Sequence, residues 1–179
     1  MKKLLSAKAW QLFILIVICG AWVSPSPLRE FIDSVAVVTF SLWIYAIGVY
    51  GQYRITELGL KMMNVKLFKV NVIFVVAFWF IAIIYFTTHV HINEVNKPTD
   101  TFQPINIILN VAFLYLIFAV FQTIIFACKT IAKIELRREV SFGDYFANLL
   151  LIAFLFIGIW ILQPKISRLI GTGKQEVSY

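Results

Sequence analysis

Charged residues are scarce in this sequence and absent from five long stretches of it. Asp, Glu, Lys and Arg make up 14% of the 179 residues and hydrophobic residues make up 61%, whereas soluble domains have about 25% and 45–50%. None of these charged residues and no His occurs in the apolar blocks Ala9–Val23, Val35–Tyr50, Val70–Thr88, Ile105–Cys128 and Phe146–Leu162. The composition excludes a soluble core. It indicates a polytopic helical membrane protein, because a segment in hydrocarbon must satisfy its own backbone groups.

Motifs for catalysis and cofactor binding are also missing. The sequence contains no G-x-S-x-G, no H-E-x-x-H and no glycine-rich phosphate loop. His89 and His91 would face the same side only in an extended segment, and zinc needs a tighter set of three or four ligands. The two cysteines, Cys19 and Cys128, fall near opposite membrane faces and act as small apolar residues. We therefore expect no enzyme activity, no catalytic, metal-binding or cofactor-binding residues, and no cofactor.

The five blocks predict an all-α integral membrane protein with a single domain, residues 1–179. Four transmembrane helices are expected at about residues 9–23, 35–50, 70–88 and 105–128, with a fifth apolar helix at 146–162 and a flexible tail at 171–179. The N-terminal segment resembles a signal peptide in its positive start and apolar middle. Bulky Trp22 and Val23 occupy the place of a cleavage site, so we expect the segment to remain as the first transmembrane helix.

Lysine and arginine alternate between the predicted loops. The counts of these residues before the first block and after each of the first four blocks are 3, 1, 4, 1 and 4. Positively charged loops stay in the cytoplasm, so the N-terminus is predicted to be cytoplasmic. The net charge of +7 then belongs to the membrane faces, and we expect no nucleic-acid partner.

The stretch Ser141–Ile166 decides the rest of the topology. Ser141 and Asp144 have the spacing of a capping box and predict a helix start. Pro164 should end the helix near Gln163, and Gly158 could mark a bend or close helix packing. Block 146–162 either spans the membrane or is re-entrant or interfacial. The second alternative keeps all the positive charges that follow it in the cytoplasm.

Basic residues gather on the predicted inner side. Arg54, Glu57, Lys61 and Asn64 recur at spacings of three and four, which predicts an amphipathic helix that lies along the headgroups or docks a partner helix. The fourth helix should continue inward past Cys128, because its basic residues repeat every four positions. The residues predicted to contact lipid headgroups are Lys61, Lys66, Lys69, Lys129, Lys133 and Arg137.

Three amides lie in the longest apolar block. Asn106 and Asn110 are four residues apart and share a helix face, whereas Gln122 lies about 160° around the helix from Asn106. Buried amides form hydrogen bonds between membrane helices. They can also line a polar path, so Asn106, Asn110 and Gln122 are candidates for helix contact or for pore lining.

Two C-terminal segments carry a resemblance to a known family. The sequences FGDYF at Phe142–Phe146 and IGIWILQPKI at Ile157–Ile166 are similar to those of uncharacterised multi-pass inner-membrane proteins of Bacteroidota. Lys8–Phe13 and the turn Ser24–Pro27 fit the same pattern. The resemblance implies a location in the bacterial inner (plasma) membrane. It implies no activity, substrate or catalytic residue.

The functional expectation follows from these absences. Ion-coupled transporters carry ionisable residues inside the membrane, and the five blocks have none. We expect a scaffold, an anchor or a small subunit of a membrane assembly, with the lipid bilayer and other membrane subunits or further copies of the chain as partners. The alternative is a homo-oligomeric pore or passive transport protein, because hydrophobic pores need no charges.

Overall fold

The computed structural model describes residues 5–18, 28–93 and 104–171, and the side chains of residues 5–18, 32–84 and 107–170. Within these ranges the chain forms helices and no strands. The elements are α2 (Ala9–Leu12), π-helix η1 (Phe13–Ile18), α4 (Leu28–Glu57), α5 (Val65–Asn93), α6 (Pro104–Leu136), α7 (Phe142–Ala153), α8 (Leu155–Ile166) and π-helix η2 (Ser167–Gly171). The prediction of an all-helical protein is confirmed.

Three of these helices are long and apolar enough to cross a membrane. The qualifying segments are Ile32–Glu57, Val65–Ile84 and Ile107–Leu136. They correspond to the second, third and fourth predicted helices, and each continues past the predicted bounds because polar residues at its ends stay helical. α5, for example, runs through His89 and His91 to Asn93, where a loop was expected.

The first predicted helix is described only in part. α2 and η1 together form a short apolar helix, Ala9–Ile18, and residues 19–23 lie outside the described residues. The predicted flexible tail also lies outside them, except for Gly171 at the end of η2. A count of four transmembrane helices is therefore not confirmed.

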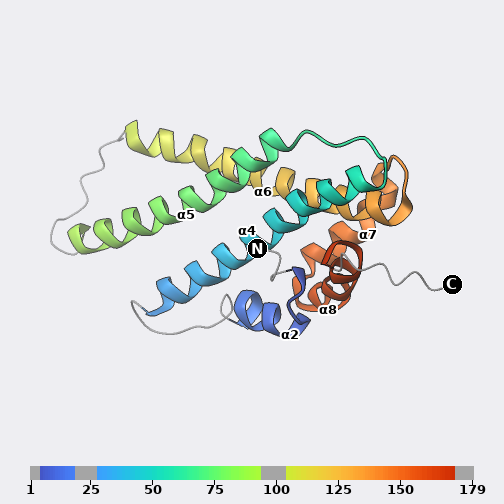
Figure 1. The fold of residues 1–179 in the computed structure, drawn as a ribbon. Helices are drawn as coiled ribbons and strands as arrows, with labels where there is room; N and C mark the ends of the chain where they lie inside the picture. Colours follow the sequence, from blue (N-terminus) through green and yellow to red (C-terminus); the bar gives the residue numbers. More distant parts are fainter. Residues whose placement is uncertain (1–4, 19–27, 94–103, 172–179) are drawn as a thin grey trace.

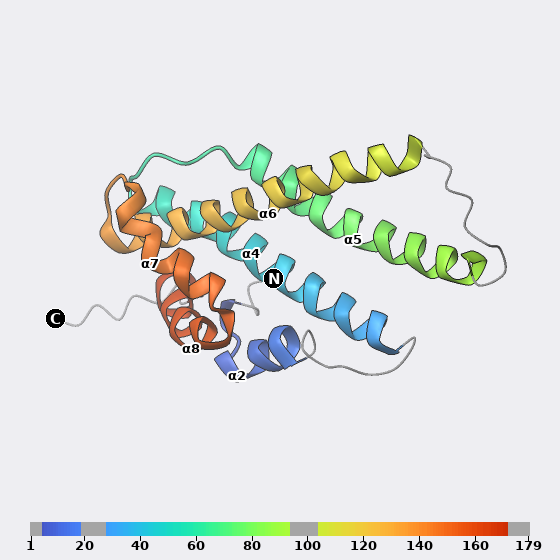
Figure 2. The same cartoon turned by 180° about the vertical axis from the view of Figure 1, so that it is seen from behind.

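Helices α4, α5 and α6 pack against one another in all three pairs. α4 and α6 converge toward their C-terminal ends, whereas the opposite ends of the three helices lie apart (Figures 1 and 2). The core at their contact is apolar and aromatic, and the ring of Phe68 stacks on that of Phe126 with centroids 4.4 Å apart. Other buried members of this core are Trp43, Ile44, Ile47, Ala127 and Ile131.

The segment between α4 and α5 corrects the predicted amphipathic helix. α4 ends at Glu57, and Gly59 adopts a φ of 71°, which is favourable for glycine at a helix end. The Leu60 N–H donates to Ile55 O and the Gly59 N–H donates to Thr56 O, the bond pattern of a Schellman motif. Lys61 and Asn64 therefore follow the end of the helix and do not share a stripe with Arg54.

The fifth predicted helix is two helices. α7 and α8 have 12 residues each, about 18 Å at 1.5 Å per residue, which is less than the roughly 30 Å of a hydrocarbon core. Phe154 separates them with φ −95° and ψ 59°, close to inverse γ-turn values of about −75° and +65°. The bend thus falls at Phe154, four residues before the predicted position at Gly158.

Gly158 instead permits close packing of the two short helices. A Cβ atom at this position would lie 1.6 Å from the backbone oxygen of Leu151, so only glycine fits there. In a straight helix these two residues would be about 10 Å apart. α7 and α8 therefore form a tightly bent pair, and α8 is viewed nearly end-on in Figure 1 while α4 to α6 lie across the picture.

The prediction that Pro164 ends the helix is wrong. Pro164 lies inside α8, which continues to Ile166. Proline removes one backbone hydrogen bond, here the bond to Trp160 O. The next turn compensates by widening into η2, and the Ser167 N–H donates to both Gln163 O and Pro164 O.

Candidate functional site

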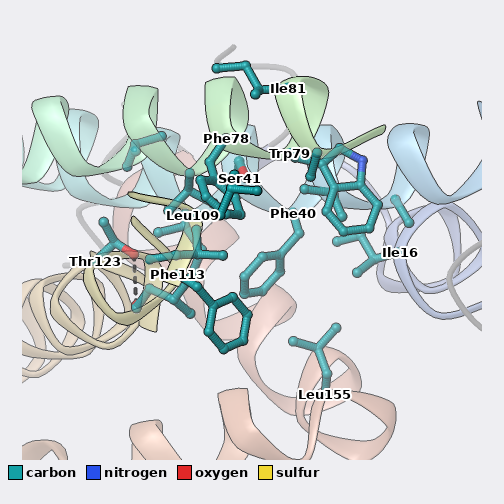
Figure 3. A pocket seen from close by; sticks show the side chains of 18 of the residues that line it. Ile16, Phe40, Ser41, Phe78, Trp79, Ile81, Leu109, Phe113, Thr123 and Leu155 are labelled. Atoms are coloured by element: carbon teal, nitrogen blue, oxygen red, sulfur yellow. Dashed lines mark hydrogen bonds between the residues drawn. The ribbon is translucent and has the colours of Figure 1, made fainter. Parts of the chain in front are cut away.

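A cavity of about 1040 Å³ lies between the helices. α4, α5 and α6 supply most of its wall, where these three helices diverge (Figure 1). Ile16 of η1 and Leu155, the first residue of α8, complete the lining from the other side (Figure 3). Its volume is at the upper end of the roughly 300–1,000 Å³ that ligand pockets occupy.

Large apolar side chains dominate the cavity wall. Phe40 of α4, Phe78 and Trp79 of α5, and Phe113 of α6 all line it (Figure 3). Aliphatic residues fill most of the remaining wall, and none of the described residues that line it is charged. This wall suits an apolar occupant.

Three polar side chains, apart from the Trp79 indole, also line the cavity. They are Ser41, Asn110 and Thr123. Thr123 is buried and its hydroxyl donates to Val120 O at 2.9 Å. Asn110 is exposed and forms no hydrogen bond within the part of the chain that the structure describes. It is therefore the amide that is free to bind an occupant.

Two of the three predicted amides, Gln122 and Asn110, have different surroundings in the structure. Gln122 accepts a hydrogen bond from Asn71 Nδ2 at 3.1 Å, and the Tyr115 hydroxyl donates to Asn71 Oδ1 at 2.7 Å. Gln122 thus joins α6 to α5 and is a helix-contact residue. Asn110 faces the cavity, and the side chain of Asn106 lies outside the described residues.

Sequence reasoning missed a buried amide at Gln163. Its Nε2 donates to Leu5 O at 3.1 Å and to Ala7 O at 2.9 Å, and its Oε1 accepts from Trp43 Nε1 at 2.9 Å. Gln163 is only 1% exposed. It fixes the N-terminal segment to both α4 and α8. The available signal was a single amide at the end of an uncharged run.

Sequence reasoning also missed a second amide, Gln52, which lies near the C-terminal end of α4, where α4 and α6 converge. Its Nε2 donates to Thr130 Oγ1 at 3.1 Å, and its Oε1 accepts from the Met63 N–H at 2.8 Å. Gln52 is buried. One side chain therefore connects α4, α6 and the segment that leads into α5.

The prediction that Lys133 contacts lipid headgroups is wrong. Lys133 is 1% exposed, and its Nζ donates to Lys61 O at 2.7 Å and to Glu139 Oε1 at 2.5 Å. A buried ammonium needs such partners. Lys133 therefore holds the chain segments before α5 and after α6 together at the end of the bundle.

The other predicted headgroup residues have accessible side chains. Lys61, Lys66, Lys69 and Arg137 are exposed, and Lys129 is half-buried with Nζ 5.3 Å from the centre of the Tyr145 ring. The predicted continuation of the fourth helix past Cys128 is confirmed. α6 extends to Leu136, and Arg137 ends it with a φ of 51°.

The predicted cap at the start of α7 is confirmed. Asp144 Oδ2 accepts from the Ser141 N–H at 2.8 Å and from the Ser141 hydroxyl at 3.0 Å. Arg138 also forms an ion pair with Asp144 Oδ1 at 2.7 Å. The hydrogen bond from the Ser141 backbone, followed by those from the Ser141 hydroxyl and Arg138, lowers the pKa of Asp144 below its ordinary value of 3.8.

A second ion pair fixes the end of α8. Lys165 Nζ lies 2.7 Å from Glu135 Oε2 of α6 and donates to Asn148 Oδ1 of α7 at 3.1 Å. Both ends of the α7–α8 pair are thus tied close to the C-terminal end of α6. Among the described residues, no group of three or more His, Cys, Asp or Glu side chains could hold a metal ion.

Comparisons of this chain with protein-family models, with curated proteins and with solved structures find no match. Its function is therefore inferred from the cavity, the buried amides and the basic end of the bundle.

Proposed function

We propose that this chain is a multi-pass integral membrane protein without a catalytic site, and that it acts as a scaffold, an anchor or a small subunit of a membrane assembly. One observation carries the proposal. Most of the polar side chains buried in the apolar bundle form hydrogen bonds that join separate elements. Satisfied polar networks of this kind specify one arrangement of helices.

Two ionisable side chains of the bundle also join separate parts of the chain. Lys133 and Lys165 each bond to partners on other segments, so these two cations contribute to packing the segments together. A rigid body that presents a broad apolar surface to its surroundings suits the role of a subunit.

The membrane placement that fits this role has α4, α5 and α6 as spans and the α7–α8 pair as a re-entrant or interfacial unit. Support comes from the ion pairs Arg138–Asp144 and Lys165–Glu135, which tie the start and the end of the pair to one end of α6. The positive-inside rule then places that end in the cytoplasm. The N-terminus lies on the same side when the first apolar block, Ala9–Val23, crosses the membrane as a fourth span. The bacterial inner membrane is the compartment that we propose.

The basic end of the bundle would lie at the inner headgroups. Lys61, Lys66, Lys69, Lys129 and Arg137 are not buried. Each such cation near an anionic surface contributes about 1 kcal/mol of attraction. Together these charges would hold the chain at a fixed depth in the bilayer.

A homo-oligomeric pore is the second candidate. The exposed amide of Asn110 favours it, because such a group could face a lumen shared by several copies. Gln122 supports it less, since its amide oxygen already accepts from Asn71 within the chain. The scaffold role therefore has the stronger support.

Native mass spectrometry of the full chain after gentle extraction tests the proposal. A stable complex with other membrane proteins is the expected result. A ring of identical chains whose conductance in planar bilayers is lost in Asn110→Leu, with the mass of the ring unchanged, would instead establish the pore. A bare monomer in several mild detergents would contradict both assignments.

A further inference from the structure

We infer that the cavity between α4, α5 and α6 binds an acyl chain of a glycerolipid from the outer leaflet, and that the Asn110 amide donates a hydrogen bond to the ester carbonyl of that lipid. The inference uses the membrane placement proposed above and is independent of the scaffold role. It rests on the composition of the wall, the depth of the free amide and the volume of the cavity.

The wall fits a flexible hydrocarbon chain better than a helix. Membrane helices that dock closely use small residues at the contact, commonly four positions apart. The cavity is instead lined mainly by large aromatic and branched side chains, among them Phe40, Phe78 and Phe113. Its small residues, Ala36, Ser41, Ala82 and Thr123, show no such spacing. An acyl chain can follow this uneven surface, whereas a regular helix surface cannot approach it closely.

Asn110 lies at the depth of lipid ester groups. Lys129 is the first charged residue after the apolar run of α6 and marks the inner boundary of the hydrocarbon. Asn110 precedes it by 19 residues, which is about 28 Å of helix, and a hydrocarbon core is about 30 Å thick. The amide that lines the cavity therefore stands at the outer boundary, where the ester linkages of the outer leaflet lie.

The chemistry at this point is complementary. Asn110 has two amide N–H donors and no hydrogen-bond partner among the described residues. An ester carbonyl is a good acceptor, and an acyl chain attached to it would extend from the boundary into the apolar cavity. A volume of about 1040 Å³ is in the range of sites for large lipophilic ligands.

Native mass spectrometry with a defined lipid tests the site. The delipidated full chain is titrated with a palmitoyl-oleoyl phosphatidylglycerol that has two ester linkages. Ala82→Trp fills the cavity, whereas Ala77→Trp adds the same side chain on α5 at an exposed position outside the lining. We expect Ala82→Trp to weaken lipid binding about tenfold or more, because the indole takes the space of the chain, and Ala77→Trp to bind as the wild type does.

A second comparison tests the hydrogen bond without altering the cavity wall greatly. Asn110→Leu should bind the diester lipid about three- to tenfold more weakly, the range that one membrane hydrogen bond supplies. A diether analogue lacks the carbonyl, so the wild type and Asn110→Leu should bind it equally.

Three outcomes would overturn the inference. The first is equal lipid retention by the wild type and both tryptophan variants. The second is a second copy of the chain, or a partner polypeptide, that is lost in Ala82→Trp while lipid binding is kept. The third is an equal effect of Asn110→Leu on the diester and diether lipids. The first and third results do not bear on whether the chain belongs to a larger assembly.

Discussion

At the scale of single residues, Gln163 connects three parts of the chain that are far apart in the sequence. It accepts from the indole of Trp43 and donates to the carbonyls of Leu5 and Ala7. A glutamine amide is suited to this position because it has both a donor group and an acceptor on one short side chain. The N-terminal segment is therefore held in the bundle by polar bonds as well as by apolar contact.

Replacing Gln163 with leucine should destabilise the fold. The change leaves the Trp43 indole and two backbone carbonyls without partners in a buried place, which costs about 1–3 kcal/mol. Thermal unfolding in detergent, followed by circular dichroism, measures the loss. In a Trp43→Phe background the same change should cost less, because one partner is already absent. Equal losses in the two backgrounds would show that the Trp43–Gln163 bond contributes nothing.

The Asp144 cap should make the start of α7 sensitive to acid. The folded protein lowers the pKa of Asp144 below the ordinary 3.8, so the cap contributes stability that is fully present above that value. The contribution is lost as the pH falls through the lower pKa of the folded state. The stability difference between the wild type and Asp144→Asn should be constant from pH 5 to pH 7 and should shrink below about pH 4. A difference that persists unchanged at pH 2 would contradict this origin.

At the scale of elements, helix α7 of the bent α7–α8 pair is amphipathic. Tyr145, Asn148 and Ile152 of α7 are buried, and their spacing of three and four places them on one face. Phe142, Phe146 and Leu150 are exposed on the other face. α8 then crosses the end of α7 so closely that Gly158 meets the backbone of Leu151.

Gly158→Ala should open this pair. The added methyl group would overlap the Leu151 carbonyl oxygen at 1.6 Å, and because that atom belongs to the backbone the helices must separate, at a cost of about 1–3 kcal/mol. Gly143→Ala is the matched control on α7, since nothing lies within 4 Å of its added Cβ, and it should leave the stability unchanged or raise it by at most about 1 kcal/mol. Thermal unfolding and limited proteolysis between α7 and α8 measure both effects. A Gly158→Ala variant as stable as Gly143→Ala would refute the close contact.

At the scale of the whole molecule, the ion pairs of the α7–α8 unit predict which side the C-terminus occupies. Arg138–Asp144 and Lys165–Glu135 tie both ends of the unit to the basic end of α6. If that end is cytoplasmic, as the positive-inside rule requires, then the C-terminus is cytoplasmic as well.

An alkaline phosphatase fusion in a bacterial host tests this topology, because the enzyme is active only in the periplasm. A fusion after Tyr179 should be inactive, and a fusion after Thr99, between α5 and α6, should be active. An active fusion after Tyr179 would show that the C-terminal unit crosses the membrane.

The amino-acid sequence by itself was sufficient to predict an all-helical chain with segments apolar enough to cross a membrane. Uncharged runs such as Val70–Thr88 must satisfy their backbone groups internally, and the Ser141–Asp144 cap forms between residues three apart. These features depend on neighbours along the chain, so their pattern is visible in the sequence. The alternation of lysine and arginine likewise predicts an orientation before any packing is known.

Only the tertiary structure decided how the polar residues are used and where the chain bends. Lys133 fits the basic stripe of α6 in sequence, yet a carbonyl from the segment before α5 and a carboxylate after α6 enclose it. Gln163 and Asn110 are both single amides in apolar surroundings, and one is buried in hydrogen bonds while the other faces a cavity. The difference arises because the partner of a polar side chain is set by segments distant in sequence, and a local pattern does not contain their positions.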